Sequence, residues 1–151
     1  MTSGRLFILT YFSVMLFISR CSGVGGDVQG GRSALQTGGP NDAIGYLARA
    51  ADADPNYKIP YRVRAGVLPY LGRAYLETGK DREARQTLER AVSLDGDDLF
   101  AHLYLGIALL KTGARERGRN EIKDGLRAVH DALEYIAEDR IAAFFWDPGM
   151  E

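Results

Sequence analysis

The stretch YLGRAYLETG at residues 70–79 returns 34 residues later as YLGIALLKTG at residues 104–113. Seven of the ten positions are identical, and they hold tyrosine, leucine, glycine, alanine, leucine, threonine and glycine. Small, large and turn-forming residues that recur together at a fixed period indicate repeated supersecondary units, because each such unit buries its apolar face only against its neighbours. The sequence therefore predicts a stack of repeats in place of one globular core.

The residues on both sides of this stretch extend the pattern. One copy has the spacing Leu68-x2-Leu71-Gly72-x2-Tyr75, then Ala84-x3-Leu88, Ala91 and Gly96. The next copy has His102-x2-Leu105-Gly106-x2-Leu109, then Gly118-x3-Ile122 and Gly125, and an earlier half copy has Ala43-x3-Leu47, Ala50 and Pro55. This spacing resembles the tetratricopeptide repeat, a helix–turn–helix unit with the pattern W-x2-L-G-x2-Y, A-x3-F and P. The resemblance implies an all-α fold: a right-handed superhelical array of about three units with a C-terminal capping helix.

The repeated glycines have physical roles in such a unit. Gly72 and Gly106 let the first helix of each unit approach the second closely. Gly79 and Gly113 end the first helices, because a left-handed backbone conformation costs glycine little. Asp81 is then expected at the start of a second helix, where the helix dipole favours negative charge.

The chain divides into four expected segments. Residues 1–23 are an export signal or membrane anchor, and residues 24–39 are a Gly-rich linker with a degenerate first helix at about 28–37. Residues 40–128 form the repeat array, in which Pro60 is expected to start a long helix that Pro69 kinks or splits. Residues 129–151 are a capping extension that should cover the last repeat, entered by one long helix to about Asp139.

The N-terminal segment has the composition of a targeting sequence. Arg5 precedes 13 uncharged and mostly apolar residues at positions 6–18, which match the apolar region of an export signal and are short for a membrane span. Cys21 is the only cysteine, and ISRCSG around it resembles a bacterial lipobox, except that Arg20 stands where that motif has a small residue. The open alternatives are a lipoprotein lipidated at Cys21, an uncleaved anchor or ordinary signal, and a cytosolic protein. A lipoprotein or an uncleaved anchor predicts a protein of the bacterial cell envelope, anchored at the membrane and facing the periplasm, whereas an ordinary signal predicts a secreted protein.

Composition and motifs point away from catalysis. The net charge of −1 gives no basic field for nucleic acid, and the arginines alternate with acids as on solvated helix surfaces. No phosphate-binding, nucleophile or zinc motif occurs, so we expect no enzyme activity, no metal and no cofactor. His102 is predicted to be part-buried within its repeat, while His130, Asp131 and Glu134 are predicted on a solvated helix face.

The resemblance implies a protein-binding scaffold or adaptor, because the first helices of tetratricopeptide repeats line a concave groove that holds a partner segment. The groove positions carried onto this chain are Gly66, Pro69, Arg73, Leu76 and Glu77, then Phe100, Leu103, Ile107, Leu110 and Lys111. The cationic clamp that holds chaperone tails in this family is absent apart from Arg73, so an apolar wall of Phe100, Leu103, Ile107 and Leu110 replaces it. Two alternatives remain: the C-terminal segment fills the groove, or the chain is a structural subunit that self-associates into homo-oligomers through IAAFFW at residues 141–146.

Overall fold

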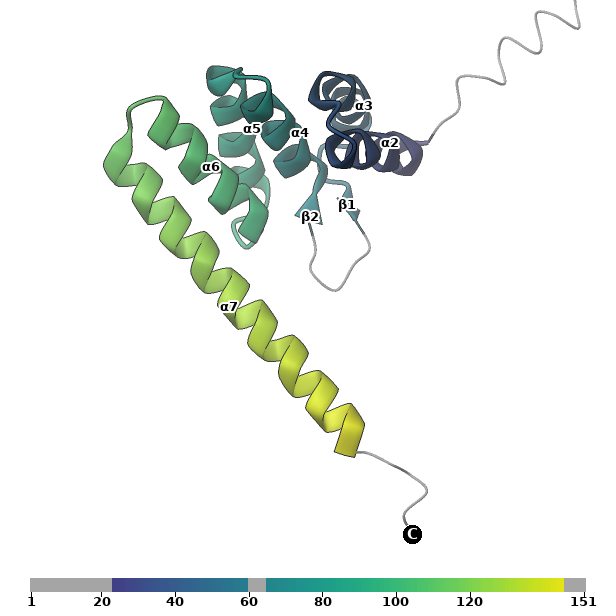
Figure 1. Cartoon of the computed structure of the whole chain (residues 1–151), viewed down its shortest axis with the longest axis vertical. Coiled ribbons are helices and arrows are strands. Elements are labelled where there is room, and N and C mark those ends of the chain that lie inside the picture. Colours follow the sequence, from purple (N-terminus) through teal and green to yellow (C-terminus); the bar gives the residue numbers. More distant parts are fainter. Residues whose placement is uncertain (1–22, 60–64, 146–151) are drawn as a thin grey trace, which may run out of the picture.

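The computed structural model describes residues 23–59 and 65–145, with the side chains of the last helix described to Glu138 (Figure 1). Within these residues the chain forms six α-helices and one pair of two-residue strands. In chain order they are α2 (Val24–Gln36), α3 (Pro40–Ala53), β1 (Lys58–Ile59), β2 (Ala65–Gly66), α4 (Val67–Glu77), α5 (Asp81–Leu94), α6 (Leu99–Lys111) and α7 (Arg115–Phe145). The predicted all-α array is confirmed.

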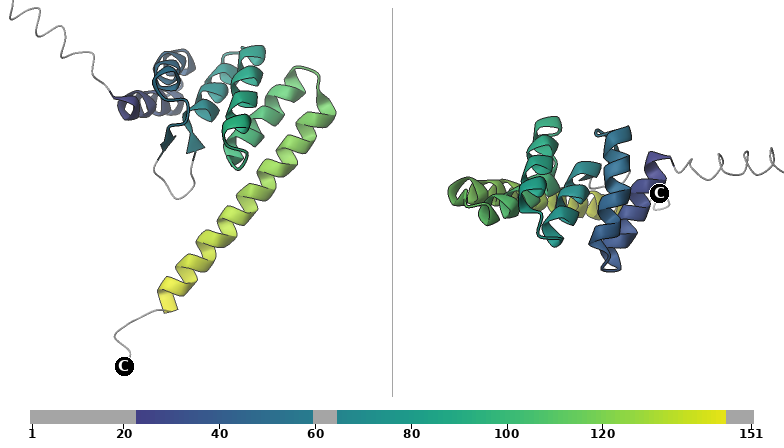
Figure 2. Two further views of the ribbon diagram at one scale, coloured as in Figure 1. Left: turned by 180° about the vertical axis from the view of Figure 1, so that it is seen from behind. Right: turned by 90° about the horizontal axis from the view of Figure 1, so that it is seen from above.

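The helices pack as three consecutive pairs: α2 with α3, α4 with α5, and α6 with α7. The first helices of the pairs also contact one another, α2 with α4 and α4 with α6, so they form one layer (Figure 2). A first cluster of buried side chains joins the two N-terminal pairs, and a second lies between α5 and α6. Each pair thus buries apolar surface against the next, as stacked repeats require.

The turn inside each pair has the same geometry three times. Gly38, Gly79 and Gly113 have φ angles of 81°, 75° and 92°, which confirms the left-handed residue predicted at the end of the first helix. The threonine before each glycine caps the helix by donating its hydroxyl hydrogen to a carbonyl four residues back, as Thr112 does to Ala108 at 2.8 Å. The repeated Thr-Gly dipeptide is therefore a structural stop signal.

Helix pairs approach most closely at glycines, as predicted. A Cβ atom at Gly72 would lie 2.4 Å from Cγ of Leu88, and one at Gly106 would lie 2.8 Å from the carbonyl oxygen of Gly118. Gly31 has the same position in the first pair, where a Cβ atom would lie 2.4 Å from Cγ of Leu47. Any side chain at these positions requires the helices to move apart.

The first repeat is more complete than the sequence indicated. Residues 24–39 were expected to be largely a linker with a degenerate helix, but α2 already begins at Val24 and runs for 13 residues. Gly31 and the buried Asp27 explain the difference, because the glycine packs against α3 and Asp27 accepts a 2.7 Å ion pair from Arg49 of that helix. Tertiary contacts therefore outweigh the low helix propensity of the four glycines in α2.

The expectation of a long helix from Pro60 is wrong. Lys58 and Ile59 pair antiparallel with Ala65 and Gly66, and α4 begins only at Val67. Pro69 then lies in the first turn of α4, where its missing N–H leaves no helical carbonyl without a partner and no kink is needed. Residues 60–64 lie outside the described part.

The last helix is longer than predicted and differently placed. α7 runs for 31 residues, and its N-terminal half packs on α6. Its C-terminal half continues straight away from the helix layers, as Figures 1 and 2 show, and does not lie over the last repeat. The described part of the C-terminal extension therefore projects where a cover was expected, and it does not fold back into the layer of first helices.

Candidate functional site

A row of aromatic side chains lies across the first helices of the second and third repeats. Tyr70 of α4 lies 6.4 Å from Phe100 of α6, and Phe100 lies 6.3 Å from Tyr104 in a nearly parallel arrangement, both measured between ring centroids. The guanidinium of Arg32 in α2 lies 5.6 Å from the Tyr70 ring centroid, which is cation–π distance. We call Tyr70, Phe100 and Tyr104 the aromatic row. It joins the second and third repeats, and the contact with Arg32 links it to the first.

A polar cluster borders this row. Arg73 donates to Glu77 at 2.7 Å and is hydrogen-bonded to the Tyr104 hydroxyl. Partial burial alone would lower the pKa of Arg73, but the bond to Glu77 and the neighbouring Tyr104 outweigh it and raise that pKa. Burial raises the pKa of Tyr104, so its hydroxyl stays protonated at neutral pH. The positive charge of Arg73 is thus already matched within the protein.

The predicted groove residues occupy three different environments. Phe100 belongs to the aromatic row, and Ile107 and Leu110 are 40% and 38% exposed on α6. Leu103 is half-buried against α7, because its Cγ lies 2.7 Å from where a Cβ at Gly125 would stand. The predicted apolar wall is therefore divided: Leu103 mainly holds α7, whereas Ile107 is accessible. Leu110 is partly accessible and also contacts α7, since its Cγ lies 3.1 Å from where a Cβ at Gly118 would stand.

The remaining predicted positions are bonded or buried. Lys111 donates to Asp81 of α5 at 2.9 Å, and Leu76 packs half-buried against the second core cluster. Gly66 and Pro69 are buried at the start of α4, where they line a small pocket together with Asp98. The helix start predicted at Asp81 is confirmed.

Asp98 fixes the start of α6. Its Oδ1 accepts hydrogen bonds from the backbone N–H groups of Phe100 and Ala101 at 3.0 and 3.1 Å. Its Oδ2 accepts a hydrogen bond from the N–H of Gly66 at 2.7 Å, and Asp98 itself is only 3% exposed. One buried carboxylate therefore caps α6 and holds β2 beside it, which sets the separation of Phe100 from Tyr70 on α4.

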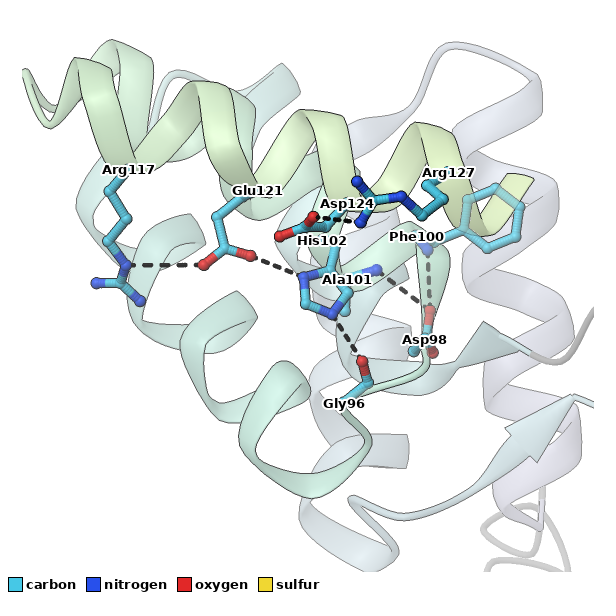
Figure 3. A network of polar contacts seen from close by, with 9 residues as sticks. All are labelled: Gly96, Asp98, Phe100, Ala101, His102, Arg117, Glu121, Asp124 and Arg127. Carbon is cyan, nitrogen blue, oxygen red and sulfur yellow. Dashed lines mark hydrogen bonds and ion pairs between the residues drawn. The ribbon is translucent and has the colours of Figure 1, made fainter. Parts of the chain in front are cut away.

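His102 links α6 to its neighbours, as Figure 3 shows. Its Nε2 lies 2.7 Å from the carbonyl oxygen of Gly96, and its Nδ1 lies 2.7 Å from Oε2 of Glu121 on α7. Burial would lower the pKa of His102, but these two acceptors outweigh it and raise the pKa above 6.5. Both acceptors are satisfied only when both ring nitrogens carry protons, so the bonded form is the cation. The prediction of a part-buried histidine is confirmed.

Acidic and histidine side chains of the projecting helix are exposed. His130, Asp131 and Glu134 lie within 4.8 Å of one another and are all solvent-accessible, as predicted for a solvated face. In the part of the chain with described coordinates, no helix combines the length and apolarity needed to cross a bilayer. Cys21, the predicted lipidation site, lies outside that part.

Sequence reasoning missed the aromatic row as a unit. Tyr70 and Tyr104 are the first identical letters of the repeated stretch, yet neither belongs to the W-x2-L-G-x2-Y signature of the repeat. Identity at a position outside the signature was the available signal. The contact of Arg32 with Tyr70 had no such signal, because its repeat was expected to be degenerate.

Residues 64–108 match the family model of the tetratricopeptide repeat. DnaJ homolog subfamily C member 3 from Mus musculus is 31% identical over 110 residues, which is 70% of this chain and 20% of that protein. The protein of the same name from Homo sapiens matches with the same identity and the same coverage. The chain thus spans about a fifth of the length of the curated relatives it matches.

Solved structures show the same fold. The second tetratricopeptide domain of Spaghetti (RPAP3), bound to the HSP90 peptide SRMEEVD, has a TM-score of 0.61 and 20% identity, covering 71% of this chain and 93% of that one. MamA AMB-1 has a TM-score of 0.59 and 19% identity, covering 73% of this chain and 56% of that one. The described helices therefore form a superhelical tetratricopeptide array.

Proposed function

Because the chain carries tetratricopeptide repeats, we propose that it is a non-enzymatic adaptor or scaffold that binds a segment of another protein. The binding face is the layer of α2, α4 and α6. The observation that carries this proposal is the aromatic row, since Phe100 belongs to neither core cluster and lies between Tyr70 and Tyr104, which pack half-buried against the first and the second cluster. Large aromatic side chains at a repeat surface are the residue types that anchor protein partners.

The partner segment should be apolar and not acidic. Ile107 and Leu110 are exposed beside the row, which offers apolar contact area. Two cations of this layer are already paired, Arg73 with Glu77 and Lys111 with Asp81, and the Arg32 guanidinium lies against Tyr70. The peptide bound by the Spaghetti domain, SRMEEVD, has three acidic residues. An acidic segment of that kind would have to break these ion pairs, so we expect this chain to bind a different sequence.

Crosslinking in cells tests the binding face. A photoreactive residue at Ile107 should crosslink a partner protein, and Phe100→Ser should reduce the yield by weakening binding by about 2 kcal/mol, roughly thirtyfold. The matched control is a photoreactive residue at Tyr46, which is 41% exposed on α3 in the other layer and should give no such product. Equal crosslinking at both positions, or survival of the product in Phe100→Ser, would refute the assigned face. The melting temperature of Phe100→Ser should stay within a few degrees of the parent, because the side chain is half-buried.

We propose that the adaptor is held at a bacterial envelope membrane by residues 1–23. The support is the apolar run at positions 6–18 followed by Cys21. Growth with labelled palmitate tests lipidation: label on the parent chain and none on Cys21→Ser is the expected result. If neither chain carries label, the protein has an uncleaved anchor or is secreted. Membrane fractionation distinguishes these two cases, because only an anchored chain stays with the membrane.

A further inference from the structure

The imidazole of His102 faces two acceptors that belong to different parts of the chain. Its Nδ1 faces Oε2 of Glu121 on α7, and its Nε2 faces the carbonyl oxygen of Gly96 in the turn before α6, each at 2.7 Å (Figure 3). A neutral imidazole has one N–H, so it donates to only one of these acceptors. At the other, a nitrogen lone pair would face an oxygen lone pair, which is unfavourable. One of the two contacts must therefore open when His102 loses its proton.

The contact with Gly96 is the one that opens. A hydrogen bond to a carboxylate is stronger than one to a backbone carbonyl, so the neutral ring keeps its hydrogen on Nδ1, toward Glu121. Glu121 is also held from its other side, because Arg117 lies 3.7 Å from its Oε1 and donates to Glu89 of α5 at 2.8 Å. Gly96 lies in an exposed turn and has room to move away from Nε2.

The charged groups of the elements around His102 determine when this happens. They are Arg117, Glu121, Asp124 and Arg127 on α7, and Asp95, Asp97 and Asp98 in the turn; Arg73 and Glu77 of α4 face Tyr104 instead. Burial alone would lower the pKa of His102, but the bonds to Gly96 and Glu121 and the charge of Asp124 raise it above 6.5. The cation is therefore favoured relative to an ordinary histidine, and raising the pH through the pKa of the folded state opens the contact.

The turn that carries Gly96 joins three elements. Asp95 forms an ion pair with Lys58 of β1. The carboxylate of Asp98 accepts the N–H of Gly66 in β2 while it caps α6. The bond from the imidazole to Gly96 is the third tie, and it is the one that a change of protonation at His102 removes.

Tyr70 and Phe100 face one another across this joint. Tyr70 follows Gly66 by four residues on α4, and Phe100 follows Asp98 by two residues on α6. Their ring centroids lie 6.4 Å apart with all three ties in place. A movement of the turn therefore changes the separation of two members of the aromatic row.

We propose that His102 is a proton-controlled switch of the aromatic row. When the ring is a cation, Gly96 is bonded, the turn is fixed, and Tyr70 and Phe100 keep the contact described above. When the ring is neutral, the turn moves away from His102, the two rings separate, and the row binds its partner segment less tightly. The movement of the turn follows from the contacts of His102 alone, whereas the effect on binding rests on the adaptor function proposed above.

A pH titration followed by nuclear magnetic resonance tests the switch in the full-length chain. The amide signals of Gly96, Gly66 and Phe100 should move with the same midpoint as the His102 ring, above pH 6.5. The cross-relaxation signal between the rings of Tyr70 and Phe100 should weaken above that midpoint.

The chain has two histidines, so each serves as the control for the other. His130 is exposed on the outer half of α7, and His130→Gln should leave all of these changes as in the parent. His102→Gln has no ring to titrate, so the amide and ring signals should lose their dependence on pH.

A second variant separates titration from a purely structural role. Glu121→Gln replaces the carboxylate by a neutral amide, so the His102 ring should titrate at a lower pH than in the parent. The amide of Gly96 should then follow the new midpoint. A histidine that merely fills space would leave the midpoint of Gly96 unchanged.

Crosslinking through Ile107 in isolated membranes tests the effect on binding. The yield should be lower at about pH 8.5 than at about pH 6, and His102→Gln should remove the difference. Absence of any product would refute the assigned binding face, while the titration would still test the switch.

Four results would overturn the proposal. They are titration of His102 without movement of Gly66 and Phe100, a pH-dependent ring signal that persists in His102→Gln, a midpoint that Glu121→Gln does not lower, and equal crosslinking through Ile107 at both pH values.

Discussion

The contact between α6 and α7 should make an alanine at Gly106 unfavourable, against the usual trend for helices. A Cβ atom there would lie 2.8 Å from the carbonyl oxygen of Gly118 and 3.0 Å from the backbone nitrogen of Ile122. Both neighbours belong to the backbone, so no rotamer change relieves the contact and the two helices must separate by several tenths of an ångström. This separation also loosens the packing of Leu103 and Leu110 on α7.

The expected magnitude follows from two opposing terms. Overpacking of this kind costs about 1–3 kcal/mol, and replacing glycine by alanine inside a helix returns about 1 kcal/mol. Gly106→Ala should therefore lower the free energy of unfolding by about 1 kcal/mol, and Gly106→Leu or Gly72→Leu should lower it further. Gly45 is the matched control, because it is a helical glycine in α3 whose Cβ position has only the Arg49 guanidinium nearby, at 4.0 Å. Gly45→Ala should raise the free energy by about 0.5–1 kcal/mol.

Urea unfolding followed by circular dichroism measures both changes. The two alanine variants should have effects of opposite sign, separated by about 2 kcal/mol, and the melting temperatures should diverge by several degrees. A stabilising Gly106→Ala would refute the argument, since it would mean that α6 and α7 do not approach through this glycine. The orientation of α7 on α6 would then have to be revised.

Three further predictions concern the hydrogen bonds of Asp98, those of His102, and the removal of N-terminal residues. Asp98→Ala should destabilise by about 2–3 kcal/mol in urea unfolding, because it removes the cap of α6 and leaves the buried Gly66 N–H without an acceptor, while Asp98→Asn should lie between variant and parent. The raised pKa of His102 contributes stability that is fully present below pH 6.5 and is lost as the pH rises through the pKa of the folded state. The free energy of unfolding should therefore be lower at about pH 9 than at about pH 6, and His102→Gln should lack this decrease. An equal decrease in that variant would contradict the role of the Gly96 and Glu121 bonds. Removal of residues 1–22 should leave the melting temperature unchanged, whereas starting at Val28 should lower it, because the ion pair of Asp27 with Arg49 is then lost.

The repeat pattern predicted the parts of the fold that depend on local residue types. Gly79 and Gly113 were identified as helix ends, and Gly72 and Gly106 as close contacts, because glycine has few other reasons to recur at a helical position. α2 was underestimated because its glycines lower helix propensity, while the contacts of Gly31 and Asp27 with α3 are made by residues far apart in sequence.

The segment that leads into α4 shows more directly what the repeat pattern does not predict. The sequence favours a helix start at Pro60 and places Pro69 inside that helix, because propensity alone does not choose between a start there and one at Val67. The choice is made by Asp98, more than thirty residues away from Gly66, since its carboxylate takes the N–H of Gly66 and leaves β2 extended. Position in the repeat predicted that Phe100 and Ile107 lie on the accessible side of α6, and in the structure Phe100 is half-buried in the aromatic row and Ile107 is exposed. Leu103 was misplaced because the family positions do not show that Gly125 of α7 would leave room for it.

The shared carboxylate of Asp98 also bears on how the array unfolds. In a linear array, stability is a sum of terms within units and terms between neighbours, and weak neighbour terms let the ends open independently. Asp98 belongs to the third unit, yet it accepts the hydrogen bond that fixes the loop leading into the second. Melting the first turn of α6 therefore frees the Gly66 amide as well, and the two units lose structure in one step. Native-state hydrogen exchange should then give the Gly66 and Ala101 amides a common opening free energy, making the second and third repeats a single cooperative folding unit.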